Sequence, residues 1–106
     1  MGLENEVDKL KAIQKYKDAA SRYTEVEIAK GWRSEVYYRI GQVYWDLTDD
    51  NAIDVSLKKS YYESAKSYLH MAKNEYSKFT YLTDDRSKRN IEGISILLMK
   101  LEGRQP

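Results

Sequence analysis

The chain has 106 residues, which is the size of one domain, since domains typically hold about 100 to 150 residues. Lys and Arg total 18 and Asp and Glu total 17, so the formal net charge is only +1. This balance argues against the strongly basic field of a dedicated nucleic-acid-binding protein.

The chain contains no cysteine, which excludes disulfides, thiolate metal sites and thiol nucleophiles. The longest apolar run, residues 96–99, is far shorter than the ~20 residues of a membrane-spanning helix. The first residues also lack the basic and then apolar pattern of a signal peptide. We therefore expect a cytoplasmic protein with no membrane contact.

The composition favours long helices. The single proline is the last residue, and only five glycines are present, so few residues would interrupt a helix. Ten tyrosines and two tryptophans supply large side chains for a core, because each aromatic ring can bury on the order of 150 to 250 Å². We predict one all-α domain over residues 1–106 with a tyrosine-rich core and no strands.

The first predicted helix covers residues about 3–30 and is ended by Gly31. Its apolar or small residues are spaced 4-3-4-3 and share one helical face: Ala12, Tyr16, Ala19, Tyr23 and Val26. The second helix covers residues 34–47, and Ser34 is its predicted N-cap. Its stripe is Tyr37, Ile40, Tyr44 and Leu47.

Residues 48–56 are polar turn formers and predict a loop. The third helix, residues 57–80, has a stripe formed by Tyr62, Ala65, Leu69, Ala72, Tyr76 and Phe79. The fourth, residues 84–102, is capped by Thr83 or Asp84 and stopped by Gly103. Its stripe is Ile91, Ile94, Leu98 and Leu101.

The four stripes alternate between two types. The first helix matches the third at an offset of 46 residues: positions 16, 19, 23 and 26 correspond to 62, 65, 69 and 72. The second helix matches the fourth at an offset of 54: positions 37, 40, 41 and 44 correspond to 91, 94, 95 and 98. The second type resembles the first helix of a tetratricopeptide repeat, W-x2-L-G-x2-Y, with Tyr37 in the tryptophan place, followed by Ile40, Gly41 and Tyr44. Ala65, Leu69 and Ala72 resemble the small, aromatic and small positions of its second helix.

This resemblance implies four antiparallel helices, arranged as two helical hairpins in an open array. A closed four-helix bundle is the alternative, since the same spacing of small and aromatic residues is common in such bundles. The resemblance also implies a groove for a partner peptide or helix, lined by Glu35, Tyr38, Gln42 and Trp45 on the second helix and by Arg89, Glu92, Ile96 and Met99 on the fourth. Tyr38 and Trp45 are the expected anchors, because aromatic residues dominate binding hot spots.

The sequence offers no motif for catalysis, a cofactor or a metal. Asp46, Thr48, Asp50 and Asp54 alternate as in a calcium loop, but Asn51 takes the glycine position and Leu57 the position of the closing glutamate. His70 is the only histidine and falls between lysines on the polar side of the third helix. We therefore expect a non-enzymatic protein with no cofactor and no metal.

Two alternative functions remain open. Lys59, Lys66, Lys73 and the segment 86–89 are interleaved with tyrosines and could bind single-stranded nucleic acid, although we expect no such partner because the tyrosines follow the buried period. The other alternative is a structural homo-oligomer. Two incomplete repeat units bury little surface alone, and the first or fourth helix could pair with a second copy.

Overall fold

The computed structural model describes residues 2–78 and 85–103, and all regular secondary structure in these ranges is α-helical. The helices are α1 (Gly2–Ala20), α2 (Glu25–Ala29), α3 (Trp32–Thr48), α4 (Val55–Lys78) and α5 (Asp85–Gly103). The predicted all-α class is confirmed, with five helices in place of four. None of the described helices is long and apolar enough to cross a membrane.

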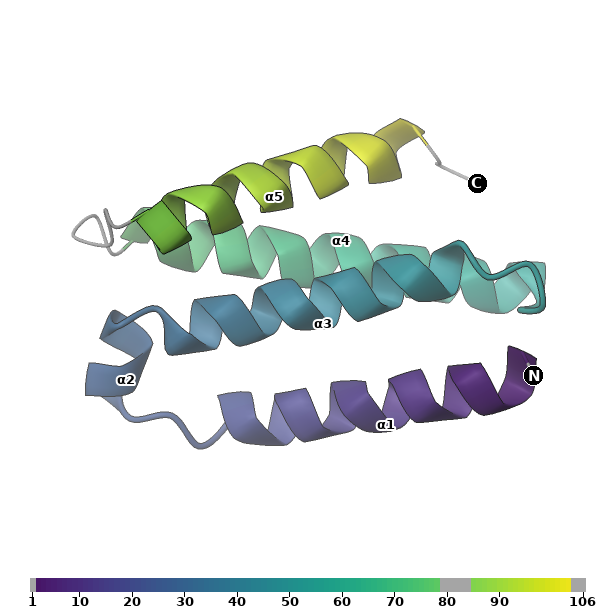
Figure 1. Ribbon diagram of the computed structural model, residues 1–106, viewed down its shortest axis with the longest axis horizontal. Helices are drawn as coiled ribbons and strands as arrows, with labels where there is room; N and C mark the ends of the chain where they lie inside the picture. Colours follow the sequence, from purple (N-terminus) through teal and green to yellow (C-terminus); the bar gives the residue numbers. More distant parts are fainter. Residues whose placement is uncertain (1, 79–84, 104–106) are drawn as a thin grey trace.

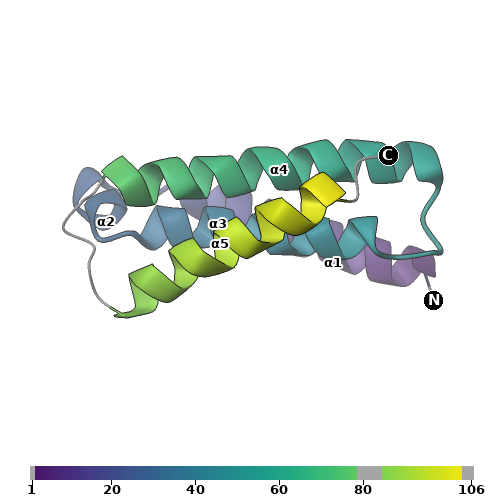
Figure 2. The same cartoon turned by 90° about the horizontal axis from the view of Figure 1, so that it is seen from above.

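The four long helices run in alternating directions, so that each is antiparallel to the long helix before it (Figure 1). Helix α3 is central: it packs most extensively on α4 and also contacts α1, α2 and α5. Helices α1 and α5 flank opposite sides of α3, and within residues 2–78 and 85–103 no backbone contact joins them. Figure 2 shows that α5 crosses α3 obliquely.

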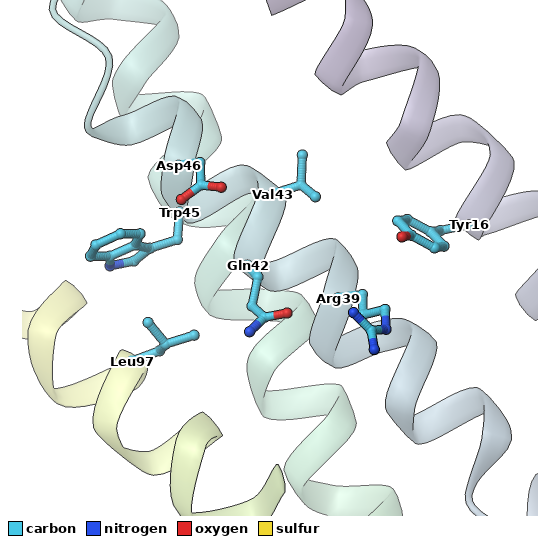
Figure 3. Close-up of a pocket in the computed structure, with 7 residues that line it drawn as sticks. All are labelled: Tyr16, Arg39, Gln42, Val43, Trp45, Asp46 and Leu97. Atoms are coloured by element: carbon cyan, nitrogen blue, oxygen red, sulfur yellow. The ribbon is translucent and has the colours of Figure 1, made fainter.

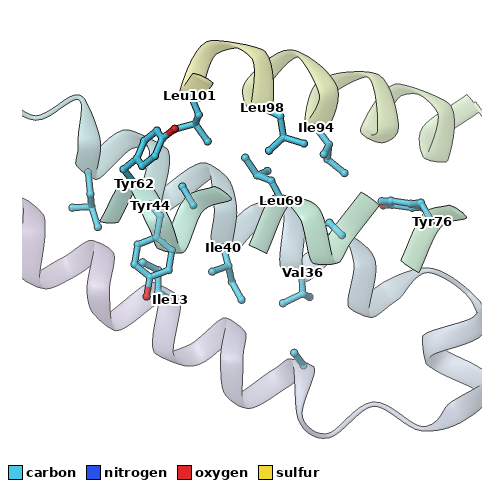
Figure 4. Packing of buried hydrophobic residues seen from close by; sticks show 14 of the residues in the cluster. Ile13, Val36, Ile40, Tyr44, Tyr62, Leu69, Tyr76, Ile94, Leu98 and Leu101 are labelled. Atoms are coloured by element: carbon cyan, nitrogen blue, oxygen red, sulfur yellow. The ribbon is translucent and has the colours of Figure 1, made fainter. Parts of the chain in front are cut away.

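The core lies mainly between α3, α4 and α5 (Figure 4). Ile40, Leu69 and Ile94 are completely buried, one from each of these helices. The predicted stripe of the third helix is confirmed from Tyr62 to Tyr76, while Phe79 lies outside the described residues. In the fourth helix the predicted positions 94, 98 and 101 are buried and position 91 is half-buried. A 3.6-residue period therefore located most of the core in these helices.

The prediction of one continuous helix over residues 3–30 is wrong. Helix α1 ends at Ala20, and the next helix begins after Thr24. The Thr24 hydroxyl accepts a hydrogen bond from the Glu27 backbone N–H at 3.2 Å, and the Glu27 carboxylate accepts one from the Thr24 N–H at 2.9 Å. This reciprocal capping box satisfies two backbone donors at the start of a helix. It stabilises a new N-terminus at the place where the prediction continued the first helix.

The buried side of α1 also differs from the predicted stripe. Ile13 and Ala20 are its buried residues, while Ala12, Tyr16 and Ala19 are half-buried. Each of the buried positions lies one residue after a predicted one, which corresponds to a rotation of about 100° around the helix axis. Because α1 ends at Ala20, Tyr23 and Val26 do not belong to this helix and need not lie on its buried face.

The start of α3 differs from the prediction as well. The N-cap is Gly31 and not Ser34, and the helix begins at Trp32. Gly31 has φ 84°, a left-handed conformation that glycine adopts without steric cost, and its carbonyl accepts a hydrogen bond from the Glu35 N–H at 3.0 Å. Ser34 instead lies in the first turn of α3 with a fully buried side chain.

The connection between α3 and α4 is a loop, as predicted, and it is shorter than expected because α4 begins at Val55. Asp54 caps this helix: its carboxylate accepts hydrogen bonds from the Ser56 N–H at 2.9 Å and the Ser56 hydroxyl at 3.0 Å. These hydrogen bonds lower the pKa of the Asp54 carboxyl. Ile53 anchors the loop in the core, with 6% of its surface exposed. The predicted caps Thr83 and Asp84 lie outside the described residues.

Four tyrosines from α3 and α4 form a continuous row of rings, the tyrosine ladder. Its centroid distances are 5.9 Å from Tyr37 to Tyr68, 6.0 Å from Tyr68 to Tyr44 and 6.0 Å from Tyr44 to Tyr61. Lys17 of α1 donates a hydrogen bond to the Tyr44 hydroxyl at 3.2 Å and lies 5.5 Å from the Tyr68 ring centroid. Cation–π contacts of this kind attract a lysine to aromatic faces, so the ladder helps to hold α1 on the α3–α4 hairpin.

Candidate protein-binding groove

A groove of about 380 Å³ lies on the side of α3 that faces away from α4, between α1 and α5 (Figure 3). We call it the α3 groove. Its lining residues come from three helices: Tyr16 of α1, Arg39, Gln42, Val43, Trp45 and Asp46 of α3, and Leu97 of α5.

The floor of the α3 groove is one face of a single helix. Arg39, Gln42, Val43 and Asp46 are spaced i, i+3, i+4 and i+7, so their side chains project from neighbouring turns on the same side. The buried residues Ile40 and Leu47 do not line the groove and belong to the hydrophobic core. The floor therefore follows directly from the amphipathic pattern of this helix.

The walls of the α3 groove are largely apolar and aromatic. Trp45 and Leu97 lie on the α5 side, and Tyr16 lies opposite them on α1 (Figure 3). The ammonium group of Lys100 is 5.9 Å from the centroid of the Trp45 ring. Tyrosine and tryptophan present a large rigid contact area to a partner at a low cost in conformational entropy. These walls therefore suit an apolar side chain of a protein ligand.

The charges at the two ends of this face of α3 differ in sign. Near its N-terminus, Glu35 forms ion pairs with Arg39 at 3.4 Å and with Arg86 of α5. Lys30 lines the same small cavity as Glu35 and Arg86, and its ammonium group is 5.5 Å from the centroid of the Trp32 ring. Asp46 lies at the opposite end, exposed to solvent, and Asp49 and Asp50 follow it along the chain.

The structure brings together part of the predicted site on α3. Gln42 and Trp45 both line the α3 groove. Glu35 lies further toward the N-terminus of α3, in its ion pairs with two arginines. Tyr38 is half-buried, and its hydroxyl faces Gly93 of α5. It therefore packs in the contact between the two helices.

The four predicted residues of α5 lie on a different face from the α3 groove. Arg89, Glu92, Ile96 and Met99 are all exposed to solvent. The α5 residues in contact with the outer side of α3 are Gly93 at Tyr38, Leu97 at the groove and Lys100 at Trp45. These three positions each follow a predicted one by a single residue, so the edge of α5 that meets α3 is displaced by about 100° from the predicted groove face, while the buried stripe of α5 lies at the predicted positions.

Sequence analysis missed five lining residues of the α3 groove: Tyr16, Arg39, Val43, Asp46 and Leu97. Arg39 and Asp46 could have been found from the sequence, because they lie three residues before Gln42 and four after it, on the face that the resemblance indicated. Tyr16 and Leu97 belong to other helices. Nothing in the local pattern says how α1 and α5 are rotated, so these two residues required the structure.

A second cavity of about 280 Å³ lies beside the tyrosine ladder, where it is lined by Lys17, Ala20, Ser21, Tyr23, Arg33, Tyr37, Tyr68 and Met71. Arg33 is paired with Glu75, at 2.5 Å between the closest atoms, and the hydrogen bond to Glu75 raises the pKa of Arg33. Burial raises the pKa of Tyr37. The ion pair joins α3 to α4, so Arg33 is already engaged within the fold.

The described residues contain no group of three or more His, Cys, Asp or Glu side chains that could hold a metal ion. His70 is exposed on α4. The ring centroid of Trp32, the first residue of α3, is 6.3 Å from that of Tyr23 in the connection between α1 and α2. The residues of the α3 groove thus offer shape, aromatic surface and charge for recognition.

No family model matches this sequence. Comparisons with curated proteins and with solved structures also found no significant match.

Proposed function

We propose that this chain is a non-enzymatic interaction module that binds a segment of a partner protein in the α3 groove. The observation that carries the proposal is the pairing of Trp45 and Leu97 as an apolar wall beside the polar floor residue Gln42. Mostly apolar concave sites with a few convergent polar groups are typical of ligand binding. The polar groups fix the orientation of a ligand, and the aromatic wall provides most of the contact area.

The helix arrangement supports an open, tetratricopeptide-like array over a closed bundle. In a closed four-helix bundle the first and last helices are neighbours, whereas α1 and α5 flank opposite sides of α3 and lack backbone contact in the described ranges. The α3 groove depends on this arrangement, because it lies between these two outer helices.

A display library of random eight-residue peptides tests the proposal. Peptides selected on the immobilised chain should lose at least about tenfold in affinity when Trp45→Ala removes the aromatic wall, a typical loss for a hot-spot residue. Gln42→Arg, which fills the groove with a larger side chain, should have a similar effect. Met99→Ala is the matched control, because Met99 is 72% exposed on α5 and lies outside the groove.

The helix content and melting temperature of each variant should be measured by circular dichroism. Selected peptides that bind Trp45→Ala and Gln42→Arg as well as the original chain would overturn the proposal, and so would a selection that enriches no peptide. If Trp45→Ala alone unfolds the chain, Trp45 belongs to the core, and the Gln42→Arg result decides the question.

A homo-oligomer formed through α5 is a second candidate, favoured by two exposed apolar residues. Ile96 is 45% exposed and Met99 is 72% exposed on the outer side of this helix. Analytical ultracentrifugation should give the mass of a dimer or larger assembly for the original chain and a monomer for Met99→Lys. A monomer for the original chain at about 100 µM would exclude this candidate.

Binding of single-stranded nucleic acid has less support. Stacking on bases requires accessible aromatic faces, whereas the tyrosines of α4 are engaged in the fold: Tyr62 and Tyr76 are each 4% exposed, and Tyr61 and Tyr68 belong to the tyrosine ladder. Lys59 and Lys73 are exposed, but Arg86 is paired with Glu35.

A further inference from the structure

We infer that the partner segment carries one acidic and one basic side chain that reach opposite ends of the α3 groove, with an apolar side chain between them. This inference rests on the proposed function and adds the chemistry of the bound segment.

The acidic side chain of the segment would lie at the Arg39 end. Arg39 and Arg86 share the single carboxylate of Glu35, and Lys30 lies at the same small cavity as Glu35 and Arg86. Two arginines that share one carboxylate leave an excess of positive charge. The N-terminus of α3 adds to it, because the helix macrodipole places partial positive charge there.

The basic side chain would lie at the Asp46 end. Asp46 is exposed, and its carboxylate forms no ion pair with the described residues. It is followed by Asp49 and Asp50 at the C-terminal end of α3, where the macrodipole is negative. Lys100 lies over the Trp45 ring, and the carboxylates of Asp46 and Asp50 exceed its single positive charge.

The spacing between these ends sets the spacing in the segment. Arg39 and Asp46 are seven residues apart on α3, or about 10.5 Å at a rise of 1.5 Å per residue. An extended chain advances about 3.3 Å per residue and points alternate side chains to the same face, so its two charged residues would be four positions apart, with the apolar residue midway between them. Between them, an apolar side chain would contact Val43, Tyr16 and Leu97, and the exposed part of Gln42 could pair with the backbone of the segment.

The eight-residue peptide library is the probe for this inference. Peptides enriched on the original chain should share an acidic and a basic residue four positions apart, with an apolar residue midway between them. Asp46→Lys should weaken binding of the best peptide at least tenfold, and replacing the basic residue of that peptide by Glu should restore binding to this variant. Arg39→Glu should also weaken binding of this peptide, and replacing the acidic residue of the peptide by Lys should restore binding to that variant.

Matched controls carry the same charge change outside the groove: Asp8→Lys and Arg22→Glu, both at exposed positions. Asp46→Asn is a milder second variant that removes the charge without reversing it. The two controls, Asp8→Lys and Arg22→Glu, should keep the affinity of the original chain within twofold.

The outcomes separate this inference from the proposed function. Peptides that depend on Trp45 but show no charge pattern, and bind equally to Asp46→Lys, would overturn the inference and leave the proposed function standing. A selection without any peptide that depends on Trp45 or Gln42 would overturn both.

Discussion

Gly41 of α3 lies directly against Leu69 of α4. A Cβ atom added at Gly41 would be 2.6 Å from Leu69 Cδ2 and 2.7 Å from its Cγ, closer than carbon atoms can approach. Leu69 is completely buried, so its side chain has little freedom to move away. The absence of a side chain at Gly41 thus allows the close packing of the central hairpin.

Gly41→Ala should therefore destabilise the chain. Overpacking of a tight core typically costs about 1 to 3 kcal/mol, and the higher helix propensity of alanine returns about 1 kcal/mol of this. We expect the free energy of unfolding, measured by urea denaturation, to fall by up to about 2 kcal/mol.

Gly103→Ala is the matched control, because a Cβ at Gly103 would meet nothing within 4 Å. It should leave the free energy of unfolding unchanged or slightly higher. Equal effects of the two substitutions would show that the Gly41–Leu69 contact does not limit the packing.

Gly93 has the same role between α5 and α3. A Cβ at this position would collide with the Tyr38 hydroxyl, and the Tyr38 Cζ would be 3.1 Å away. Gly93→Ala should lower the free energy of unfolding by up to about 2 kcal/mol, because the Tyr38 side chain must move away. Tyr38→Phe removes the colliding oxygen, so the double variant should recover most of this loss.

A double-mutant cycle in urea measures this coupling between Gly93 and Tyr38. Additive effects of the two substitutions would contradict the contact that we describe between α3 and α5.

The capping box at Thr24 should control the local stability of α2. Thr24→Ala removes the acceptor for the Glu27 N–H, and loss of an N-cap typically costs about 0.5 to 2 kcal/mol. Because α2 has only five residues and none of them is buried, the effect should be local. Hydrogen exchange should show faster exchange of the α2 amides, with unchanged protection in α4.

Glu27→Gln provides the control for this prediction, since glutamine also completes a capping box. It should preserve the protection of α2. If protection is lost throughout the chain in Thr24→Ala, then α2 unfolds together with the whole domain.

Tyr61 should make the stability depend on alkaline pH. Burial and a 2.8 Å hydrogen bond from its hydroxyl to the Glu6 carboxylate raise its pKa to about 12, from an ordinary value of about 10. The protonated form is therefore favoured in the folded state. The contribution of this tyrosine to the free energy of unfolding is fully present below pH 10 and is lost as the pH rises through 12.

The melting temperature should accordingly decrease between pH 10 and 12, and Tyr61→Phe should show a smaller decrease. NMR of ¹³C-labelled tyrosine should show that Glu6→Gln lowers the pKa of Tyr61 while leaving it above 10, because the effect of burial remains. An unchanged pKa in Glu6→Gln would contradict the role of this hydrogen bond.

Part of the fold could be predicted because it depends on local pattern. The buried positions of α4 follow a regular 3-4 spacing, and α5 carries three of its four predicted positions in the core. The break between α1 and α2 also had a local signal, since Thr24 and Glu27 form the T-x-x-E pattern of a capping box. That signal was missed because the apolar spacing continued through it to Val26, which is 65% exposed in the structure.

The candidate site was predicted only in part, for a different reason. Gln42 and Trp45 were found because they lie opposite the buried stripe of their own helix. The α5 residues were displaced by one position, because Ile96 and Leu97 are both apolar and either could face α3. The contact of Tyr38 with Gly93 favours the rotation that brings Leu97 to the groove.

The sequence by itself determined that the chain is helical and which side of α3, α4 and α5 is buried, because both follow from the repeat of apolar residues along each helix. The tertiary structure decided how α1 is rotated against α3 and which edge of the buried stripe of α5 meets α3, and hence that Tyr16 and Leu97 complete the groove. One residue of difference turns a helix by about 100°, and only the fit of specific side chains between helices selects among such rotations.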